Sequence, residues 1–331
     1  MIEMSRKRKY FDREKNDGEE NEGEKLRSAV RKGDETAVRR LVKGGVIADN
    51  NKKLWFGGTI LHDAVAGGKL PIIKLLLQAK ADVNAKTQDG RTCLHTASRM
   101  GTAGNVEIVK ELLSYSAEVN TQTKDKRTAL HYATWRGNTE IVKQLVDHGA
   151  NVNIEDEDLW SPLYWAAKSN YLQIARILVE NGACLNCINK MEMSPLHEVL
   201  KNGHVDLTTY LISEGANVVG KMKGLFQCMV DNKHMKTEDR ILLCDIFVLA
   251  GYPLSGNQQI PQILSRKPYI DQAFVKHVQN RQHEVLTLKC MCRISVRNTL
   301  IRVGDGSSIS RTMTDLPLPK ILHEYLISLN S

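Results

Sequence analysis

The stretch from Thr128 to Gly137, TALHYATWRG, decides the fold because similar text recurs along the chain. The related stretches are TILHDAVAGG from Thr59, TCLHTASRMG from Thr92, SPLYWAAKSN from Ser161 and SPLHEVLKNG from Ser194. Their fourth positions are His62, His95, His131, Tyr164 and His197, at steps of 33, 36, 33 and 33 residues. Self-similarity at such a period is the sequence signature of a solenoid built from repeated units.

Each unit reads as a pair of helices. Thr or Ser opens the first helix as a cap, and Pro162 and Pro195 follow where a helix tolerates proline. The second helix has apolar residues at helical spacing, as in Ile141, Val142 and Leu145. Exit text such as HGANVN then contains a glycine that lets the chain leave the helix through a left-handed conformation. Extended fingers are expected to lead from each unit to the next.

The period and the Thr-Pro-Leu-His-like opening resemble the ankyrin repeat. We expect an all-α ankyrin-repeat solenoid of helix-turn-helix units with hairpin fingers over residues 24–255. It contains an N-terminal cap, five clear repeats and a degenerate C-terminal repeat, because terminal units of solenoids are atypical. The repeat's histidines are interpreted as structural, with each ring bridging backbone groups of neighbouring units.

Composition narrows the class of protein. The chain has 331 residues, 42% of them hydrophobic and 25% charged, as in ordinary globular proteins. No apolar run is long enough for a transmembrane helix, and the charged segment 1–23 lacks the apolar core of a signal peptide and is expected to be disordered. The net charge of +8 comes from basic residues interleaved with acidic ones, which argues against nucleic-acid binding. We expect a cytoplasmic protein, with a nuclear location as the alternative if Arg6 to Lys9 is an import signal.

The seven cysteines suggest neither a disulfide scaffold nor a metal site, and we interpret them as reduced thiols. Cys184 and Cys187 form a Cys-x-x-Cys pair, but both fall at positions that the repeat already explains, so a zinc site is rejected. The sequence also has no phosphate loop, nucleophile elbow or paired-carboxylate motif. No catalytic residue, metal ligand or cofactor is therefore predicted.

A binding surface is predicted instead, on the concave face and the fingers. Trp135 and Arg136 end a first helix, and Trp160 lies at a finger tip; exposed Trp and Arg are typical interface anchors. The alternative is that the tryptophans fold back onto their neighbours. The predicted target-binding residues are Arg91, Arg99, Met100, Arg127, Trp135, Arg136, Asp158, Trp160 and Lys168. The cations among them suggest a target segment with some acidic character.

Two motifs follow the repeats. Leu288, Cys292 and Val296 recur every four residues in VLTLKCMCRISVRNTL, on one face of a predicted helix. The stretch TDLPLPKILHEYL, residues 314–326, then places two prolines ahead of an amphipathic segment. A core helix of the last repeat is the alternative reading of the first motif.

Together these motifs resemble a SOCS box. The resemblance implies a three-helix domain at 286–331, after a helical connector at 256–285. It also implies that Leu288, Cys292 and Val296 bind elongin C in the elongin B/C pair. The residues implied to bind cullin-5 and its RING subunit are Leu316, Pro317, Leu318, Pro319, Leu322 and Tyr325.

The whole chain resembles the ankyrin repeat and SOCS box family. The function implied is that of a non-catalytic substrate receptor in a cullin-RING ubiquitin ligase, which holds an unidentified target near a conjugating enzyme. A plain ankyrin scaffold or inhibitor that recruits no ligase is the main alternative. A nuclear cofactor that uses the basic N-terminus is a third reading.

Overall fold

The computed structural model describes residues 22–45, 58–100, 103–218, 224–250, 252, 259–265 and 270–283. In these residues it contains α-helices, labelled α2 to α17, and no strand, as predicted for an all-α fold. The chain divides into two compact units, residues 1–123 and 124–331.

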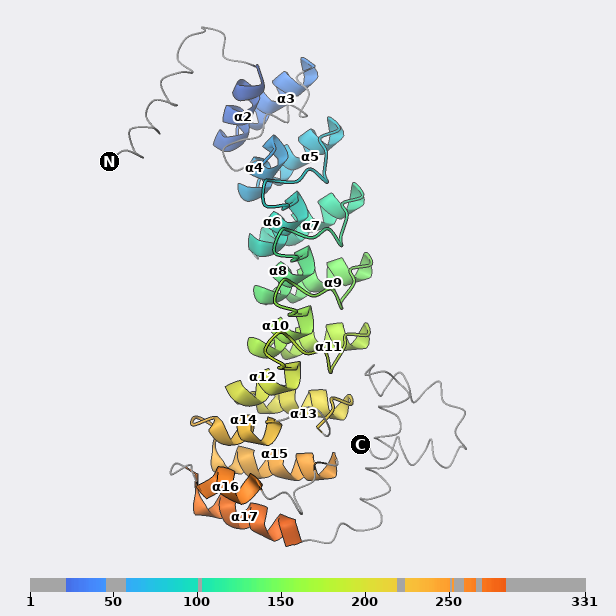
Figure 1. The fold of residues 1–331 in the computed structure, drawn as a ribbon. Coiled ribbons are helices and arrows are strands. Elements are labelled where there is room, and N and C mark those ends of the chain that lie inside the picture. The colour runs from blue at the N-terminus through green and yellow to red at the C-terminus, as the bar shows by residue number, and fades with distance from the viewer. Residues whose placement is uncertain are drawn as a thin grey trace, which may run out of the picture. The chain divides into compact units, whose positions relative to one another are not determined.

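The first unit consists of three helix pairs. Its helices are α2 (Glu22–Lys32), α3 (Glu35–Lys43), α4 (Ile60–Ala66), α5 (Leu70–Gln78), α6 (Cys93–Met100) and α7 (Ala103–Ser114). First helices pack on first helices, α2 on α4 and α4 on α6, while α3 packs on α5 and α5 on α7 (Figure 1). The predicted N-terminal cap is the pair α2 and α3.

The second unit continues the same pattern. Its helices are α8 (Ala129–Trp135), α9 (Thr139–Asp147), α10 (Pro162–Lys168), α11 (Leu172–Glu180), α12 (Pro195–Asn202), α13 (Val205–Ser213), α14 (Leu225–Asp231), α15 (Thr237–Leu249), α16 (Gln259–Ser265) and α17 (Gln272–His283). Figure 1 shows α8, α10, α12 and α14 in one layer and α9, α11, α13 and α15 in the other. The solenoid predicted from the repeat is therefore confirmed.

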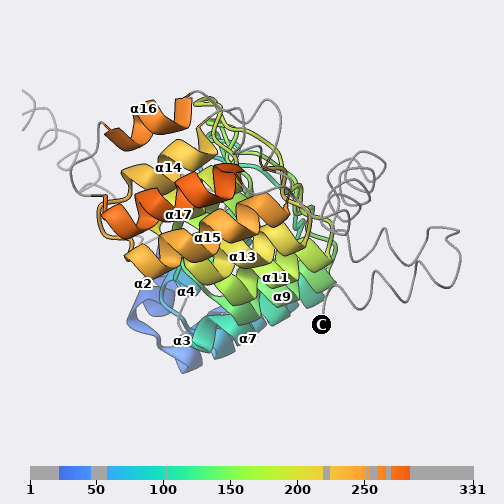
Figure 2. The same cartoon turned by 90° about the horizontal axis from the view of Figure 1, so that it is seen from below.

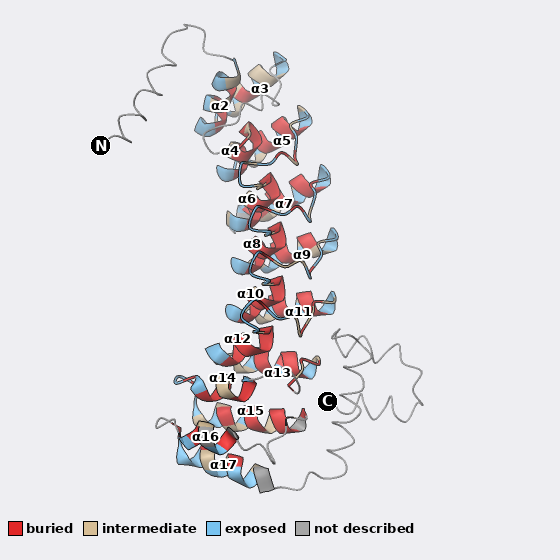
Figure 3. Cartoon of the chain, in the orientation of Figure 1, coloured by how far each residue is buried: buried red, intermediate tan, exposed pale blue. Residues whose placement is uncertain are grey.

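Apolar side chains between the two layers form the core. Leu130 and Leu163 of the first helices, and Ile141 and Leu178 of the second helices, are at most 1% exposed. In Figure 3 the buried residues line the inside of each helix pair. Complete burial of one Leu or Ile side chain stabilises the folded state by about 2 kcal/mol. These apolar contacts between the layers are therefore a main source of the stability of the fold.

The repeat's histidines join each helix start to the next finger, as predicted. His131 Nδ1 accepts the Thr128 backbone N–H at 3.1 Å, and Nε2 lies 3.1 Å from the Trp160 carbonyl oxygen. His62 contacts the Thr59 N–H and the Arg91 carbonyl oxygen in the same way. Because Nδ1 accepts a hydrogen bond, the ring proton is on Nε2, which donates a hydrogen bond to the carbonyl oxygen. Burial lowers the pKa of His131 to about 4, which keeps the ring neutral.

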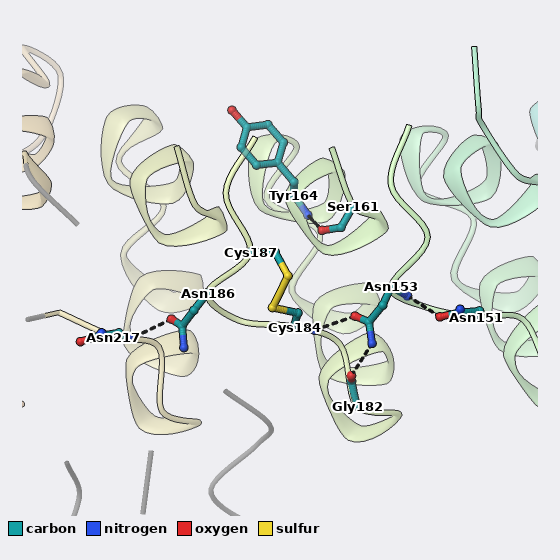
Figure 4. Close-up of a disulfide and its surroundings, with 9 residues drawn as sticks. All are labelled: Asn151, Asn153, Ser161, Tyr164, Gly182, Cys184, Asn186, Cys187 and Asn217. Carbon is teal, nitrogen blue, oxygen red and sulfur yellow. Dashed lines mark hydrogen bonds between the residues drawn. A yellow bond between two sulfur atoms is a disulfide. The ribbon is translucent and has the colours of Figure 1, made fainter. Parts of the chain in front are cut away.

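Asparagines tie consecutive fingers together. Asn153 donates to the Gly182 carbonyl oxygen at 2.9 Å and accepts the Cys184 N–H at 2.8 Å (Figure 4). One repeat later, Asn186 accepts the Asn217 N–H at 2.8 Å. Each of these side chains thus bonds to backbone groups of the next repeat. The repeat's exit text therefore serves stacking as well as the turn.

The segment predicted as a connector contains a further helix pair. Helix α16 packs on α14, and α17 packs on α15, which is how successive repeats contact each other (Figure 2). Asp245 of α15 accepts hydrogen bonds from His277 at 2.8 Å and from Arg281 at 2.7 Å, both on α17. Burial opposes the charged form of Asp245, but the hydrogen bonds and the positive charges of Arg281 and His277 together outweigh it and lower the pKa of Asp245. The described end of the chain is thus attached to the repeat that precedes it.

Candidate target-binding surface

Asp156 shapes the finger that carries Trp160. This carboxylate is 2% exposed, and its Oδ1 accepts the backbone N–H groups of Asp158 and Trp160, both at 3.0 Å. Its Oδ2 accepts from Arg127 Nε at 3.2 Å. One buried acid therefore fixes both the turn of its own finger and a cation of the preceding finger.

Three tryptophans gather beside this finger. The ring centroids of Trp160 and Trp165 are 4.6 Å apart in an edge-on arrangement, and those of Trp135 and Trp165 are 6.4 Å apart. Trp160 also stacks on Tyr164, with centroids 5.0 Å apart. Such pairs each contribute about 0.5–1.5 kcal/mol beyond their buried area. Trp165 of α10 is the centre that joins the other two rings.

Cations lie over the faces of these rings. Lys168 Nζ is 4.5 Å from the Trp160 centroid and 5.2 Å from that of Trp165. The Arg127 guanidinium lies 5.6 Å from Trp165, and that of Arg136 lies 5.6 Å from Trp135. We refer to Trp135, Trp160, Trp165, Arg127, Arg136 and Lys168 as the tryptophan–cation cluster. Its cations are held against aromatic faces, and one of them, Arg127, also pairs with Asp156.

Exposure differs within the cluster. Trp135 is 47% exposed and Lys168 and Arg136 are exposed, whereas Trp160, Trp165 and Arg127 are half-buried. The alternative that the tryptophans fold back therefore applies to Trp160, which packs on two aromatic rings, but much less to Trp135. Contact with a target stays a prediction for all of them.

The remaining predicted target residues lie outside the cluster. Asp158 is exposed at a finger tip and pairs with Lys190 of the next finger at 3.3 Å. Arg91, Arg99 and Met100 belong to the first unit, where Arg99 is exposed and the other two are half-buried. The structure thus brings together five of the predicted residues, all in the second unit.

Family models match two parts of the chain. The model of the ankyrin repeats matches three copies, at residues 26–123, 102–189 and 130–222, which together span more than half of the sequence. The SOCS box model matches residues 284–327. The chain belongs to the ankyrin repeat and SOCS box family.

Two curated proteins share a short stretch with this family member. The protein phosphatase 1 regulatory subunit 12A of Mus musculus and that of Rattus norvegicus are each 53% identical to the chain over 45 residues. The match spans 14% of this chain and 4% of each relative. It is little longer than one repeat.

The predicted SOCS-box contacts lie outside the described residues. They are Leu288, Cys292 and Val296 for elongin, and Leu316, Pro317, Leu318, Pro319, Leu322 and Tyr325 for the cullin. The family match covers all of these positions.

The sequence analysis did not predict the contact between Tyr164 and Glu198. Tyr164 stands where the other repeats have His, and its Oη donates to Glu198 Oε2 of the next repeat at 2.8 Å. Burial and the Glu198 carboxylate raise the pKa of Tyr164 well above its usual range. A side-chain pair here replaces the ring-to-carbonyl bridge. In the sequence, the only hint of this hydrogen bond was an acidic residue, Glu198, at the fifth position of its repeat.

The prediction that all cysteines are reduced thiols is wrong for one pair. Cys184 and Cys187 form a disulfide in the finger after α11, with Cα atoms 5.7 Å apart (Figure 4). The extended finger turns between them, which brings both thiols to the same side. Cys93, Cys228 and Cys244 are free, and burial raises the pKa of each, which lowers the fraction of reactive thiolate.

Neither a metal site nor a membrane span is found in the part of the chain that the structure describes. No group of three or more His, Cys, Asp or Glu side chains there could hold a metal ion. Likewise, none of the described helices is both long and apolar enough to cross a bilayer.

Proposed function

We propose that this chain is the substrate-recognition subunit of an elongin B/C–cullin-5 RING ubiquitin ligase. An ankyrin array joined to a SOCS box supports a cullin-RING substrate receptor in general, and domains of these two kinds are non-catalytic adaptors. The choice of elongins B and C and of cullin-5 rests on the sequence motifs at Leu288, Cys292 and Leu316 to Pro319. The chain would work in the cytoplasm, or in the nucleus if Arg6 to Lys9 is an import signal.

The observation that carries the target-binding half of this proposal is the tryptophan–cation cluster. Exposed Trp and Arg side chains supply most of the binding energy in many interfaces. In this cluster the buried carboxylate of Asp156 holds Arg127 and the backbone of Trp160, while the exposed Trp135 and Arg136 lie on the neighbouring first helix and its end. A surface that is ordered before binding loses less conformational entropy when the target docks.

Reconstitution with elongins B and C tests the ligase half. Truncating a central anchor typically costs about 2 kcal/mol or more. Leu288→Ala with Cys292→Ala should therefore weaken elongin binding at least about thirtyfold in calorimetry. Alanines at Leu316 to Pro319 serve as the matched control, since they should abolish cullin-5 binding while elongin affinity stays near wild type.

The result would also separate the proposal from its alternative. A plain ankyrin scaffold predicts no elongin binding by the wild-type chain. Unchanged elongin affinity in the Leu288 and Cys292 double variant would show that the motif was assigned wrongly.

The target-binding half is tested by Trp135→Ala with Arg136→Ala. Both side chains are exposed, and Trp135 makes one ring pair, so their loss should lower the unfolding free energy by only about 1–2 kcal/mol while abolishing target capture. Lys143→Ala with His148→Ala, two exposed residues on α9 and just after it, is the matched control and should capture the target normally. A large drop in melting temperature would identify Trp135 as a packing residue instead.

A further inference from the structure

The tips of three consecutive fingers share an unusual backbone conformation. Lys126, Leu159 and Glu192 have φ values of 58°, 60° and 57°, in the left-handed region, and they follow one another at the repeat spacing. In the first unit the corresponding residue is Gly90, with φ of 77°. Glycine adopts this conformation without steric cost, whereas a residue with a Cβ does not. A bulky residue such as Leu159 at this place therefore calls for an explanation other than folding.

The finger turn does not depend on the identity of its left-handed residue. Asp156 Oδ1 holds the second finger through two backbone N–H groups. Asn189 Oδ1 does the same in the third finger, accepting from Met191 at 2.9 Å and Met193 at 3.0 Å. Glycine would complete either turn with less strain. Leu159 is thus not required by the turn that displays it.

Apolar side chains project from adjacent tips. Leu159 is 40% exposed and Met191 is 64% exposed. The Lys190 N–H donates to the Asp158 carbonyl oxygen at 3.2 Å, which places the two tips in contact. These residues are among the few large hydrophobic side chains that the described part of the chain leaves exposed. The two neighbouring tips therefore each expose one large apolar side chain.

The tip that carries Leu159 leads directly into the tryptophan–cation cluster. Leu159 is followed directly by Trp160, whose ring contacts Trp165, and Trp165 in turn contacts Trp135. Lys168, over Trp160 and Trp165, pairs with no carboxylate in the described residues. The surface formed by these tips and the cluster thus carries apolar side chains beside exposed acids, Glu157 and Glu192, at the tips, while the cations Lys168 and Arg136 lie over the rings of the cluster.

We infer that this surface binds an acidic segment of the target protein that carries aliphatic side chains, with Leu159 as a specificity-determining residue. Acidic residues complement Lys168 and Arg136, while the aliphatic side chains pack on Leu159, Met191 and Trp135. The inference rests on the proposed target-binding role of the ankyrin array. It is independent of the elongin contact, so the two can fail separately.

Synthetic peptides test the chemistry directly. The first probe is a fluorescent peptide of about twelve residues in which two acidic residues precede every leucine. In the second probe serine replaces every leucine, and in the third lysine replaces every acid. The full-length chain should bind the first peptide, bind the second at least about tenfold more weakly, and not bind the third. Affinity for the first should fall as salt rises from about 0.05 M to about 0.3 M.

Glycine variants at the three tips test the role of Leu159. Leu159→Gly should weaken binding of the first peptide about tenfold while its melting temperature changes by less than about 3 °C, because the lost contacts are offset by relief of the left-handed strain. Glu192→Gly relieves the same strain one finger later and removes an acid, so it should bind equally or more tightly. Lys126→Gly should weaken binding mainly at low salt.

Several outcomes would overturn the inference. One is that the first peptide does not bind, and another is that the three peptides bind equally. A third is that Leu159→Gly and Glu192→Gly weaken binding equally, which would show that the shape of the finger causes the effect. If Leu159→Gly fails to fold, Leu159→Asn provides the second variant, since Asn tolerates the left-handed conformation without an apolar side chain. Binding by Leu159→Asn at wild-type affinity would also overturn it.

Discussion

Acidification should destabilise the second unit through His131. This ring is 1% exposed, and burial lowers its pKa from 6.5 to about 4 in the folded chain. Since the folded-state pKa is the lower one, the unfolded state binds more protons as the pH falls below 6.5. Stability is therefore fully present above pH 6.5 and is lost as the pH falls toward 4, where the loss levels off.

The two pKa values set the size of the effect. Between pH 7.5 and pH 5 the unfolding free energy should fall by about 2 kcal/mol from His131 alone. The hydrogen bond at Nδ1 explains why the folded state disfavours the protonated ring. An imidazolium cannot accept the Thr128 N–H that Nδ1 accepts in the neutral ring. His62, whose pKa burial also lowers, adds a loss of the same sign.

Urea unfolding at a series of pH values, followed by circular dichroism, measures this slope. In His131→Gln the difference between pH 7.5 and pH 5 should shrink by about 2 kcal/mol relative to wild type, even though the variant is less stable at every pH. An NMR titration of the His131 ring provides a second readout. Titration near pH 6.5 in the folded chain, or an unchanged pH slope in the variant, would refute the reasoning.

Three further predictions concern contacts within the second unit. Serines at Cys184 and Cys187 should lower the unfolding free energy by no more than about 2 kcal/mol, because the disulfide closes a very short loop; reductant should change the wild type equally in urea unfolding. Tyr164→Phe should cost about 1–3 kcal/mol, since it removes a donor from the buried carboxylate of Glu198, and Tyr164→Ala should cost more. Asp245→Ala should speed amide hydrogen exchange in α17 while α9 remains protected, because Asp245 holds α17 through two hydrogen bonds.

Much of the ankyrin array could be predicted from the sequence because its signals are periodic. The opening text fixes the register, so the helix starts and the bridges of His62 and His131 follow from position alone. The aromatic cluster was predicted only in part. Trp135 and Trp160 stood out from the pattern, whereas Trp165 occupies a variable position beside Tyr164 and was not singled out. Its spacing of three residues before Lys168 on the same helix was the signal available.

Other features could not be predicted because they depend on atoms that the fold brings together. The Cys184–Cys187 pair fits the repeat's own positions, and spacing alone does not distinguish two thiols from a disulfide. The repeat text stops after Pro261, within α16, yet α16 and α17 pack on α14 and α15 like a further unit. The terminal units of a solenoid are hard to predict from sequence, because their outer side has different neighbours from that of an internal unit.

The array separates the residues that stabilise it from those that would recognise a target. Stacking uses side chains at fixed positions, such as Asn153 and His131, which bond to backbone groups of the next repeat, and Asp156 bonds to backbone N–H groups of its own finger. Because their partners are backbone atoms, exposed positions such as Trp135 and Leu159 are free to vary with little effect on the fold. The strain at Leu159 fits this division, since a neighbouring buried carboxylate holds the turn. Changes of target specificity should therefore map to the finger tips and the ends of the first helices.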